Sequence, residues 1–351
     1  MERTGKGNEI TLSVLVPARN EEANLGACLQ SLVAGSEPGW VLGRHWELLV
    51  IDDGSVDRTA EIGRSFQGVQ VLAAPSPLPK GWTGKNHALW TGSAAARGLW
   101  LLFTEAGTVH HAGAPSRAVV EAERHGAAVL SYSPRQVMHG LLQRAVMPLI
   151  LSELATAYPP AQVNDPAKRI AAATGEFLLV RADTYREFGG HAAVASSLVG
   201  DVDLAFLAKK NKTGLRFRYA PEAVDAQAPA SARAMWQGWS RTLALLINNA
   251  LPLALWRLLD FLLVWGLPAL ALFYPTPFAW VRVALWLLWL RTLVRVYRRA
   301  ARSNCATGDV VFSILLGLPL FAALLYASWY RVKILRRVAW KGREYPVGSR
   351  L

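Results

Sequence analysis

The sequence is poor in cysteine, with Cys28 and Cys305 the two examples in 351 residues. Two cysteines so far apart exclude a disulfide-rich scaffold and a cysteine zinc site, and they favour a reducing compartment that faces the cytosol. The first ten residues, MERTGKGNEI, are polar and lead directly into an apolar run, so we expect no signal peptide there.

Glycine-rich phosphate loops are also missing. Neither G-x-G-x-x-G nor G-x-x-x-x-G-K-[ST] follows any of the apolar runs described below. This absence argues against dinucleotide-dependent oxidoreductases and against P-loop enzymes. The sequence likewise contains no internal repeat and no low-complexity tract.

Acidic residues are scarce in the last 71 residues, which contain 13 Arg or Lys residues but only Asp309 and Glu344. With 13 positive and two negative side chains, this segment therefore carries +11 of the net charge of +13. Basic residues interleaved with Trp and Leu indicate a membrane surface, because anionic headgroups attract each of them by about 1 kcal/mol. Nucleic-acid binding is the rival interpretation. No RNA- or DNA-binding signature accompanies the charge, so we expect no nucleic-acid partner.

Apolar runs and amphipathic stretches alternate through the first 135 residues. The runs at 10–17, 46–53, 69–75, 98–105 and 127–134 have the composition of buried parallel strands. The helical stretches between them predict an α/β fold with a doubly wound, mostly parallel sheet. Ligands of such sheets bind outside the carboxyl ends of the strands, so functional residues are expected just after each run.

The chain becomes more hydrophobic after residue 241. Three apolar stretches, at 258–274, 278–297 and 311–330, each approach the length that crosses a bilayer, and basic clusters flank them. We therefore expect a catalytic domain at 1–241 and a membrane-associated helical region with a basic tail at 242–351. Buried helices of a larger soluble core are the alternative, and 140–165 is expected to form an interfacial or sheet-packed helix.

The topology of the tail is ambiguous. Both basic clusters favour the cytoplasm, yet the single stretch 311–330 separates them. Either the tail crosses the membrane against this rule, or the stretch, which contains Gly317 and Pro319, forms a re-entrant hairpin.

Polar side chains follow each of the first four runs. They are Pro17, Asn20 and Glu21 after the first, Asp52 and Asp53 after the second, Lys85 beyond the third and Glu105 after the fourth. Each has an ordinary alternative as a turn, cap or solvated residue. Together at one sheet edge, carboxylates that accept from a base or ribose and a lysine that neutralises phosphate indicate a nucleotide site.

The motifs SVLVPARNEEANLGACLQSL and LLVIDDGSVDRTAEI resemble the opening of family 2 glycosyltransferases, which have the GT-A fold and use nucleotide-sugar donors. The resemblance continues through PKGWTGKNHAL, LLFTEAGTVH, GEFLLVRADTYREFGGH, VGDVDLA and MWQGWSR and covers about residues 11–241. The closing WKGREY is similar to the tail of membrane-associated members that act on carotenoid- or hopanoid-type lipids.

The resemblance implies roles for several of these residues. Asp53 is similar to the acid that reads uracil, and Pro17, Asn20, Glu21, Asp52 and Lys85 would line the same donor pocket. Asp201 of GDVDLA falls at the catalytic base, which accepts a proton from the acceptor hydroxyl in an inverting displacement. Gly200 stands where the family normally has Glu. Gly175 and Trp239 would contact the acceptor, although the usual Gln-x-x-Arg-Trp pattern is incomplete here.

TEAGT stands where the family usually has Asp-x-Asp, whose acids hold the donor and a divalent cation. Glu105 keeps one carboxylate and Gly107 has lost the other. His110 or His111 could add a nitrogen ligand, which suits Mn²⁺ better than Mg²⁺, although surface or capping histidines are commoner. Three outcomes stay open: a metal held by Glu105 alone, Lys85 in place of the metal, or a protein without transfer activity.

The sequence thus predicts an inverting, membrane-associated glycosyltransferase. It would move a sugar from a nucleotide donor, a UDP-sugar in the first instance, to a lipid acceptor at the cytoplasmic membrane face, with Mg²⁺ or Mn²⁺ as the cofactor in question. The alternatives are a polysaccharide synthase, or a catalytically silent membrane protein of the same fold that binds a nucleotide or lipid.

Overall fold

The computed structural model describes residues 10–228 and 231–347. The chain forms two compact units. Of the described residues, the first unit holds 10–137 and 160–227, and the second holds 138–159 with 228 and 231–347.

A seven-stranded sheet in the order β3-β2-β1-β4-β8-β6-β9 forms the centre of the first unit. All neighbouring pairs are parallel except those of β8, which runs antiparallel to β4 and to β6. The strands are β1 (Leu12–Ala18), β2 (Trp46–Asp52), β3 (Val69–Ala73), β4 (Trp100–Phe103), β6 (Val129–Ser133), β8 (Leu178–Arg181) and β9 (Leu215–Tyr219).

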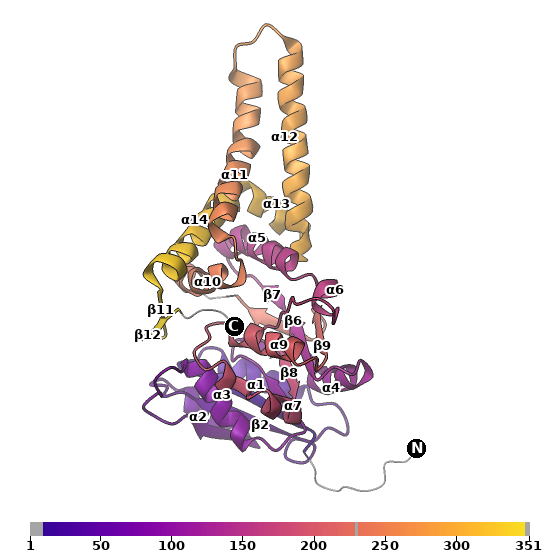
Figure 1. Ribbon diagram of the computed structural model, residues 1–351, viewed down its shortest axis with the longest axis vertical. Helices are drawn as coiled ribbons and strands as arrows, with labels where there is room; N and C mark the ends of the chain where they lie inside the picture. Colours follow the sequence, from indigo (N-terminus) through magenta and orange to yellow (C-terminus); the bar gives the residue numbers. More distant parts are fainter. Residues whose placement is uncertain (1–9, 229–230, 348–351) are drawn as a thin grey trace. The chain divides into compact units, whose positions relative to one another are not determined.

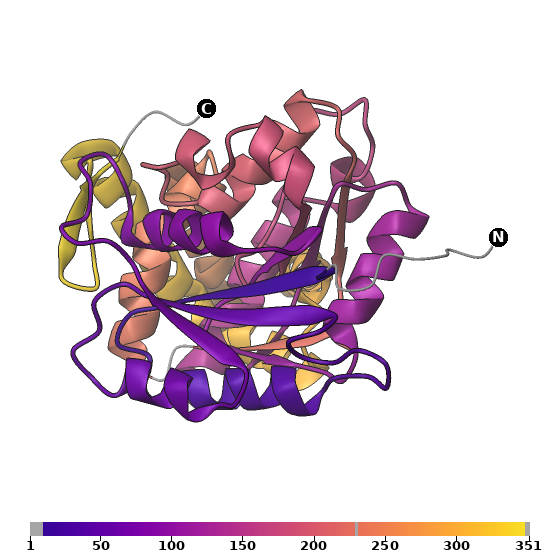
Figure 2. The ribbon, with the colours of Figure 1, turned by 90° about the horizontal axis from the view of Figure 1, so that it is seen from below.

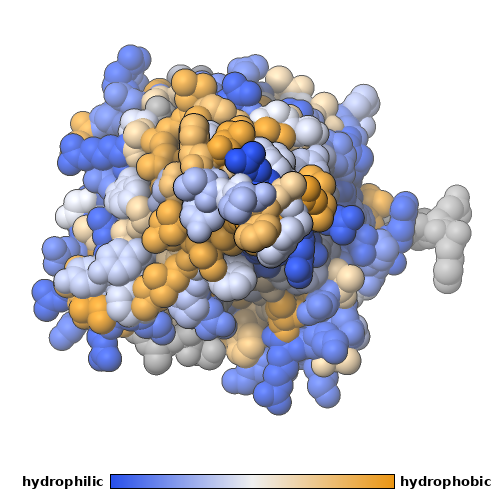
Figure 3. Space-filling view, turned by 90° about the horizontal axis from the view of Figure 1, so that it is seen from above, coloured by the Kyte–Doolittle hydropathy of each residue, from blue (hydrophilic) through white to orange (hydrophobic). Residues whose placement is uncertain are grey.

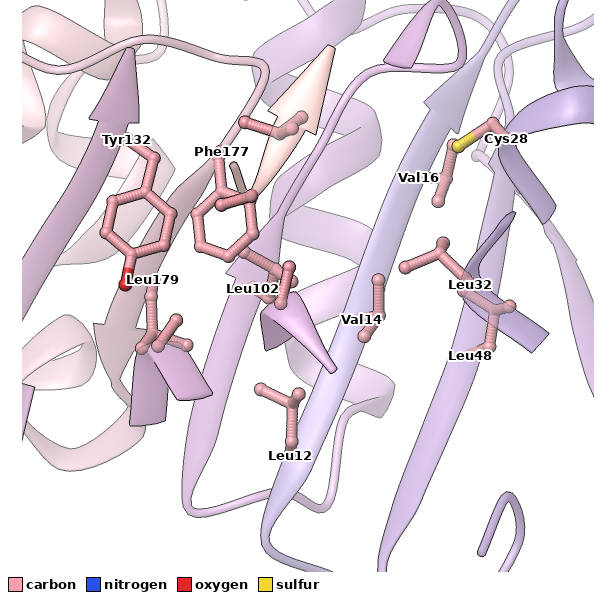
Figure 4. Close-up of a cluster of buried hydrophobic side chains, with 14 of the residues drawn as sticks. Leu12, Val14, Val16, Cys28, Leu32, Leu48, Leu102, Tyr132, Phe177 and Leu179 are labelled. Carbon is pink, nitrogen blue, oxygen red and sulfur yellow. The ribbon is translucent and has the colours of Figure 1, made fainter. Parts of the chain in front are cut away.

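Helices cover both faces of this sheet (Figure 2). They include α1 (Leu25–Ala34), α2 (Thr59–Ser65), α3 (Gly84–Ala95), α4 (Ala114–Arg124) and α9 (Gly200–Lys210). On one face, alternate residues of β1 pack with apolar side chains of the neighbouring strands and of α1 (Figure 4). The inner strands β1, β2 and β4 bury nearly every side chain, which explains their continuous apolar runs, whereas the edge strand β3 has no fully buried side chain.

Shorter elements complete the first unit. A three-stranded sheet has the order β5-β10-β7, with β5 (Thr108–His110), β7 (Arg135–Val137) and β10 (Val224–Gln227). The remaining helices are α6 (Pro160–Val163), α7 (Ala182–Glu187) and α8 (Gly190–Ala193).

The predicted fold class is confirmed: this is an α/β domain with a mostly parallel sheet, followed by apolar helices. The five predicted strands correspond to β1, β2, β3, β4 and β6. The seven-stranded sheet contains β8 and β9 in addition to these five.

The second unit is mostly helical. Its helices are α5 (Leu141–Ala157), α10 (Ala232–Leu246), α11 (Ala250–Phe273), α12 (Ala279–Ala300), α13 (Thr307–Phe312) and α14 (Leu318–Trp329), and β11 (Arg337–Trp340) pairs with β12 (Arg343–Pro346). Figure 1 shows α11 and α12 side by side as an antiparallel hairpin. The indole N–H of Trp289 on α12 donates to the carbonyl of Val264 on α11 at 3.0 Å.

Two helical stretches are long and apolar enough to cross a membrane by length and composition, Ala250–Phe273 and Thr307–Leu335. The helix between them in the chain, α12, does not meet this criterion because it carries too many arginines. The alternative of a re-entrant hairpin at 311–330 is wrong, because the backbone stays helical through Gly317 by way of a π-helical turn at Ser313–Gly317. The hairpin in this unit is formed by α11 and α12 instead.

The two compact units do not meet at residue 241, where the sequence predicts the domain boundary. The helices α5 and α10 both belong to the second unit, where their apolar side chains share one hydrophobic cluster with α11 and α14. The boundary at 241 stays a prediction about which residues serve catalysis.

Candidate functional site

The acid after β2 is held by the turn after β1. The backbone N–H of Asp53 donates to the carbonyl of Ala18 at 2.9 Å, and Nη1 of Arg19 donates to the carbonyl of Asp53 at 2.7 Å. The same Nη1 lies 3.6 Å from the Asp53 carboxylate. Pro17 is in register with Ile51 inside the sheet, so this turn begins at the carboxyl end of β1.

Other predicted donor residues join the two turns to each other. The backbone N–H of Asn20, a residue in the left-handed region at φ 53°, donates to Oγ of Ser55 at 3.0 Å. The backbone N–H of Glu21 donates to Oγ1 of Thr59 at 2.8 Å, and Oδ1 of Asp52 accepts from the backbone N–H of Ser55 at 3.0 Å. The hydrogen bonds of Asn20 and Asp52 therefore fix the shape of the two turns that follow β1 and β2.

A second group of predicted residues meets around one ammonium. Nζ of Lys85, in the first turn of α3, donates to Oε1 of Glu105 at 2.7 Å and to Oδ2 of Asp201 at 2.9 Å. Lys85 is mostly buried, at 18% side-chain exposure, whereas Glu105 is 45% exposed and opens the cluster to solvent. Burial opposes the charged form of Lys85, but the charges of Asp201 and Glu105 outweigh burial and raise its pKa.

Gly175 lies directly against this cluster. A Cβ at this position would come closer than 3.0 Å to Nζ of Lys85, Oδ2 of Asp201 and Oε1 of Glu105. The three charged ends can meet because residue 175 has no side chain. The predicted contact of Gly175 with the acceptor stays a prediction.

Glu176 is the residue of this cluster that sequence reasoning missed. Burial raises the pKa of its carboxyl to about 7, the charge of Glu105 adds to the rise, and Lys85 opposes it. Glu105 and Asp201 therefore bind the Lys85 ammonium directly, and Glu176 lies within electrostatic reach of it. The available signal was an acid immediately before the apolar run FLLV, since such a residue stands at the edge of a buried strand.

Residue 200, where the resemblance leads one to expect Glu, is packed against Asn86. A Cβ on Gly200 would meet Oδ1 of Asn86 at 2.6 Å. Nδ2 of Asn86 donates to the carbonyls of Val194 and Ser197 at 2.7 and 3.0 Å. The Asn86 side chain thus fills this space and ties α3 to the loop that leads into Asp201.

The two histidines after Glu105 have other partners. Nε2 of His110 lies 2.9 Å from Oγ1 of Thr104 and 3.2 Å from Oγ1 of Thr108, and burial lowers the pKa of this histidine to about 3. Nε2 of His111 lies 3.1 Å from the carboxylate of Asp225. The surface or capping alternative weighed from the sequence does not describe His110, which is buried in β5.

The metal prediction rests on Glu105 alone. Among residues 10–228 and 231–347, no three His, Cys, Asp or Glu side chains are arranged to hold a metal ion. Gly107 supplies no ligand, and a Cβ built there would meet open space.

Trp239 lies on α10 in the second unit, partly buried against the hydrophobic cluster of that unit. Its predicted contact with the acceptor stays a prediction.

Comparison with known proteins gives a family match. Residues 13–187 match the model of glycosyl transferase family 2. A curated relative, the 4,4'-diaponeurosporenoate glycosyltransferase of Staphylococcus aureus strain USA300, is 24% identical over 365 residues, which is 97% of this chain and 90% of the relative. The protein of the same name from strain bovine RF122 is 32% identical over 99 residues, 28% of this chain and 24% of the relative.

Solved structures give a more distant match. The glucosyl-3-phosphoglycerate synthase of Mycobacterium tuberculosis in complex with Mn²⁺ and UDP-glucose is 19% identical, with a TM-score of 0.45 over 68% of this chain and 78% of that chain. The same enzyme in complex with phosphoglyceric acid is 20% identical, with a TM-score of 0.45 over 68% and 79%.

Proposed function

The chain belongs to glycosyltransferase family 2, and from this premise we propose that it is an inverting enzyme that transfers a sugar from a UDP-sugar to a lipid acceptor at the cytoplasmic face of a membrane. The observation that carries the proposal is the Lys85 ammonium bound to both Glu105 and Asp201. This contact joins the residue proposed for the donor side to the residue proposed as base.

Asp201 is the proposed base. It lies in the first turn of α9 and is 15% exposed, so one face of the carboxylate is within reach of an acceptor. A hydroxyl acceptor must lose its proton to Asp201 as its oxygen attacks the anomeric carbon. An acceptor that is itself a carboxylate is already ionised, and Asp201 would then serve only to orient it.

The charge of the cluster supports a metal cofactor. Glu105 and Asp201 bind Lys85, and Glu176 lies within electrostatic reach of it, so a diphosphate leaving group meets a site with surplus negative charge. A divalent ion held by Glu105 and by phosphate oxygens of the donor fits the usual way in which Mg²⁺ binds, with one or two carboxylates and substrate phosphates. When bound, the ion would neutralise charge on the departing diphosphate.

The nucleoside would bind beside Asp53. The carboxylate of Asp53 is held next to Arg19 and can accept a hydrogen bond from a base N–H, as uracil provides.

A lipid acceptor is supported by two observations. The relatives that align along 97% of this chain are named for transfer to 4,4'-diaponeurosporenoate, and α11 and α12 expose many large apolar side chains. An enzyme that contacts a bilayer can take an acceptor that does not dissolve in water.

The test combines an assay and an extraction. Full-length protein is incubated with a panel of UDP-sugars and two lipid acceptors, one with a hydroxyl and one with a carboxylate, with and without Mn²⁺, and UDP release is measured. Lipid extracts of cells with and without the protein are compared by mass spectrometry. We expect UDP release that depends on the acceptor, and a glycolipid that is missing when the protein is missing.

Two results would reject the proposal. UDP binding without turnover for any donor would indicate a silent binding protein. A product that grows by successive sugars would indicate a polysaccharide synthase.

A further inference from the structure

The base of the α11–α12 hairpin carries a groove that the proposed sugar transfer does not use. Its volume is about 770 Å³, and it is lined by six arginines together with Trp256 and apolar residues of α12. The arginines are Arg257, Arg291, Arg295, Arg298, Arg299 and Arg302. We refer to it as the arginine groove.

Half of these arginines form ion pairs with buried acids of the same unit. Arg299 binds the buried Glu153 at 2.5 Å, and Arg257 and Arg295 both bind the buried Asp260. The other three, Arg291, Arg298 and Arg302, are exposed, and no ion pair involves them within 138–159 and 231–347. The arginine groove therefore keeps a surplus positive charge directed to its opening, where it can bind an anion.

The surroundings of the groove are apolar. Cζ of Arg295 lies 5.8 Å from the ring centroid of Trp256 at the edge of the groove. Val294 lines both the groove and a second cavity of about 390 Å³ whose lining is almost wholly hydrophobic. Seen from above, hydrophobic side chains gather over the end of the hairpin (Figure 3). Phe273 at the end of α11 and Trp280 at the start of α12 are exposed.

The position of the groove along the hairpin fits headgroup depth. Arg298 lies about 29 Å along α12 from its start, close to the ~30 Å hydrocarbon thickness. Arg291, at about 18 Å, can extend its long side chain toward the same level. Arg282, close to the loop, is exposed, and its long side chain can extend toward a polar region. A cationic groove bordered by Trp and followed by an apolar surface has the composition of a membrane interface.

We infer that the arginine groove binds the phosphate of an anionic phospholipid headgroup. Guanidinium groups hold phosphate through paired hydrogen bonds, which an ammonium cannot form in this fixed geometry. The neighbouring apolar cavity favours a lipid over free phosphate, because it offers a place for an acyl chain. The inference concerns residues outside the Lys85 cluster and does not depend on sugar transfer.

The test uses full-length protein in a non-ionic detergent. Short-chain phosphatidylglycerol, phosphatidylcholine, inorganic phosphate and an oligonucleotide are titrated separately, and binding is followed by tryptophan fluorescence and by the midpoint of thermal unfolding. The groove variant carries Arg291→Gln, Arg298→Gln and Arg302→Gln, which leaves the arginines that neutralise Glu153 and Asp260 in place.

A control variant removes as many charges from the same unit. It carries Arg233→Gln, Lys333→Gln and Arg337→Gln, all exposed and outside the groove. Both variants are first compared with the unchanged protein for circular dichroism and for unfolding midpoint without lipid.

We expect phosphatidylglycerol to bind more tightly than phosphatidylcholine, and its affinity to fall roughly 100-fold in the groove variant and hardly at all in the control. Equal loss in both variants would overturn the inference in favour of general charge attraction. Inorganic phosphate as effective as the lipid, or an oligonucleotide that binds more tightly, would overturn it in favour of a free-anion or nucleic-acid site.

Discussion

Each unit holds a group of buried and partly exposed charges, and the two groups are unbalanced in opposite directions. In the first unit Lys85 binds two acids, Glu105 and Asp201, and a third acid, Glu176, lies within electrostatic reach of it. In the second unit two acids, Glu153 and Asp260, are matched by the three arginines Arg257, Arg295 and Arg299.

The difference leads us to expect a binding role for the first group and a structural role for the second. A surplus of buried acid is costly and disappears when a cation arrives, so the Lys85 cluster is suited to a changing ligand. In the second unit every buried acid already has a cation, which fixes α5, α11 and α12 to one another. Substitutions in the first group should therefore act on binding and rate, and substitutions in the second on stability.

The largest effect is expected from Asp201→Asn. With a hydroxyl acceptor, transfer should fall by about 10²- to 10⁴-fold, because the amide cannot take the proton. UDP affinity should change little, since Lys85 and Glu105 remain. With a carboxylate acceptor the loss should be much smaller. UDP release and UDP titration measure the two quantities.

Asp183→Asn is the control for this change, since Asp183 is half-exposed in a surface pair with Arg181. Wild-type rates for Asp201→Asn on every hydroxyl acceptor would exclude Asp201 as the base.

Glu153→Gln should give the largest loss of stability. Glu153 is 4% exposed and binds both Arg299 and Arg257, so the neutral amide leaves buried positive charge without a partner. The cost should be about 3 kcal/mol, reduced from the full range by the partial exposure of Arg299. The unfolding midpoint measures it. Glu344→Gln, at an exposed acid of the same unit, should leave the midpoint unchanged; equal shifts would mean that the buried pairing is unimportant.

Glu176→Gln should change how the free energy of unfolding depends on pH, because it removes one acid of the first group. The pKa of Glu176 in the folded protein is raised from 4.5 to about 7, so ionisation costs the folded state stability as the pH rises through this interval. The variant should match the unchanged protein near pH 4 and exceed it by up to about 3 kcal/mol above pH 7. Unfolding midpoints across this range are the measurement, and a difference that does not vary with pH would contradict the assignment.

Gly107→Asp should have the smallest effect. The new carboxylate restores a second acid near Glu105, and a Cβ at this position has open space. UDP binding in the presence of Mn²⁺ should become about 10-fold tighter by calorimetric titration, without a change in its absence. Gly107→Asn is the matched control. Tightening by both variants would show that charge is not the cause.

The sequence was sufficient for the parallel part of the fold. Buried strands such as β1 and β2 are continuous apolar runs, and alternation with helices predicts their direction. It was not sufficient for β8, because the four residues LLVR carry no information about direction, and β8 runs antiparallel to both neighbours. The assignment of α5 to the second unit was equally inaccessible, since an apolar helix can pack against either unit.

The sequence was sufficient to identify most of the residues of the candidate site but not the contacts between them. Lys85 and Glu105 were found after predicted strands and Asp201 through the family resemblance, but Lys85 and Asp201 are 116 residues apart. Only the fold shows that one ammonium joins them. Glu176 was missed because a single acid in an apolar segment has no pattern around it, and only its neighbours give it a raised pKa.

The missing side chain of Gly175 leaves the space in which the charged ends of Lys85, Asp201 and Glu105 meet. A methyl group at this position would overlap the Lys85 ammonium and both carboxylates, so these side-chain ends would have to move apart. Alanine at 175 would therefore lengthen at least one of the two contacts of Lys85 and change the spacing of charge in the cluster.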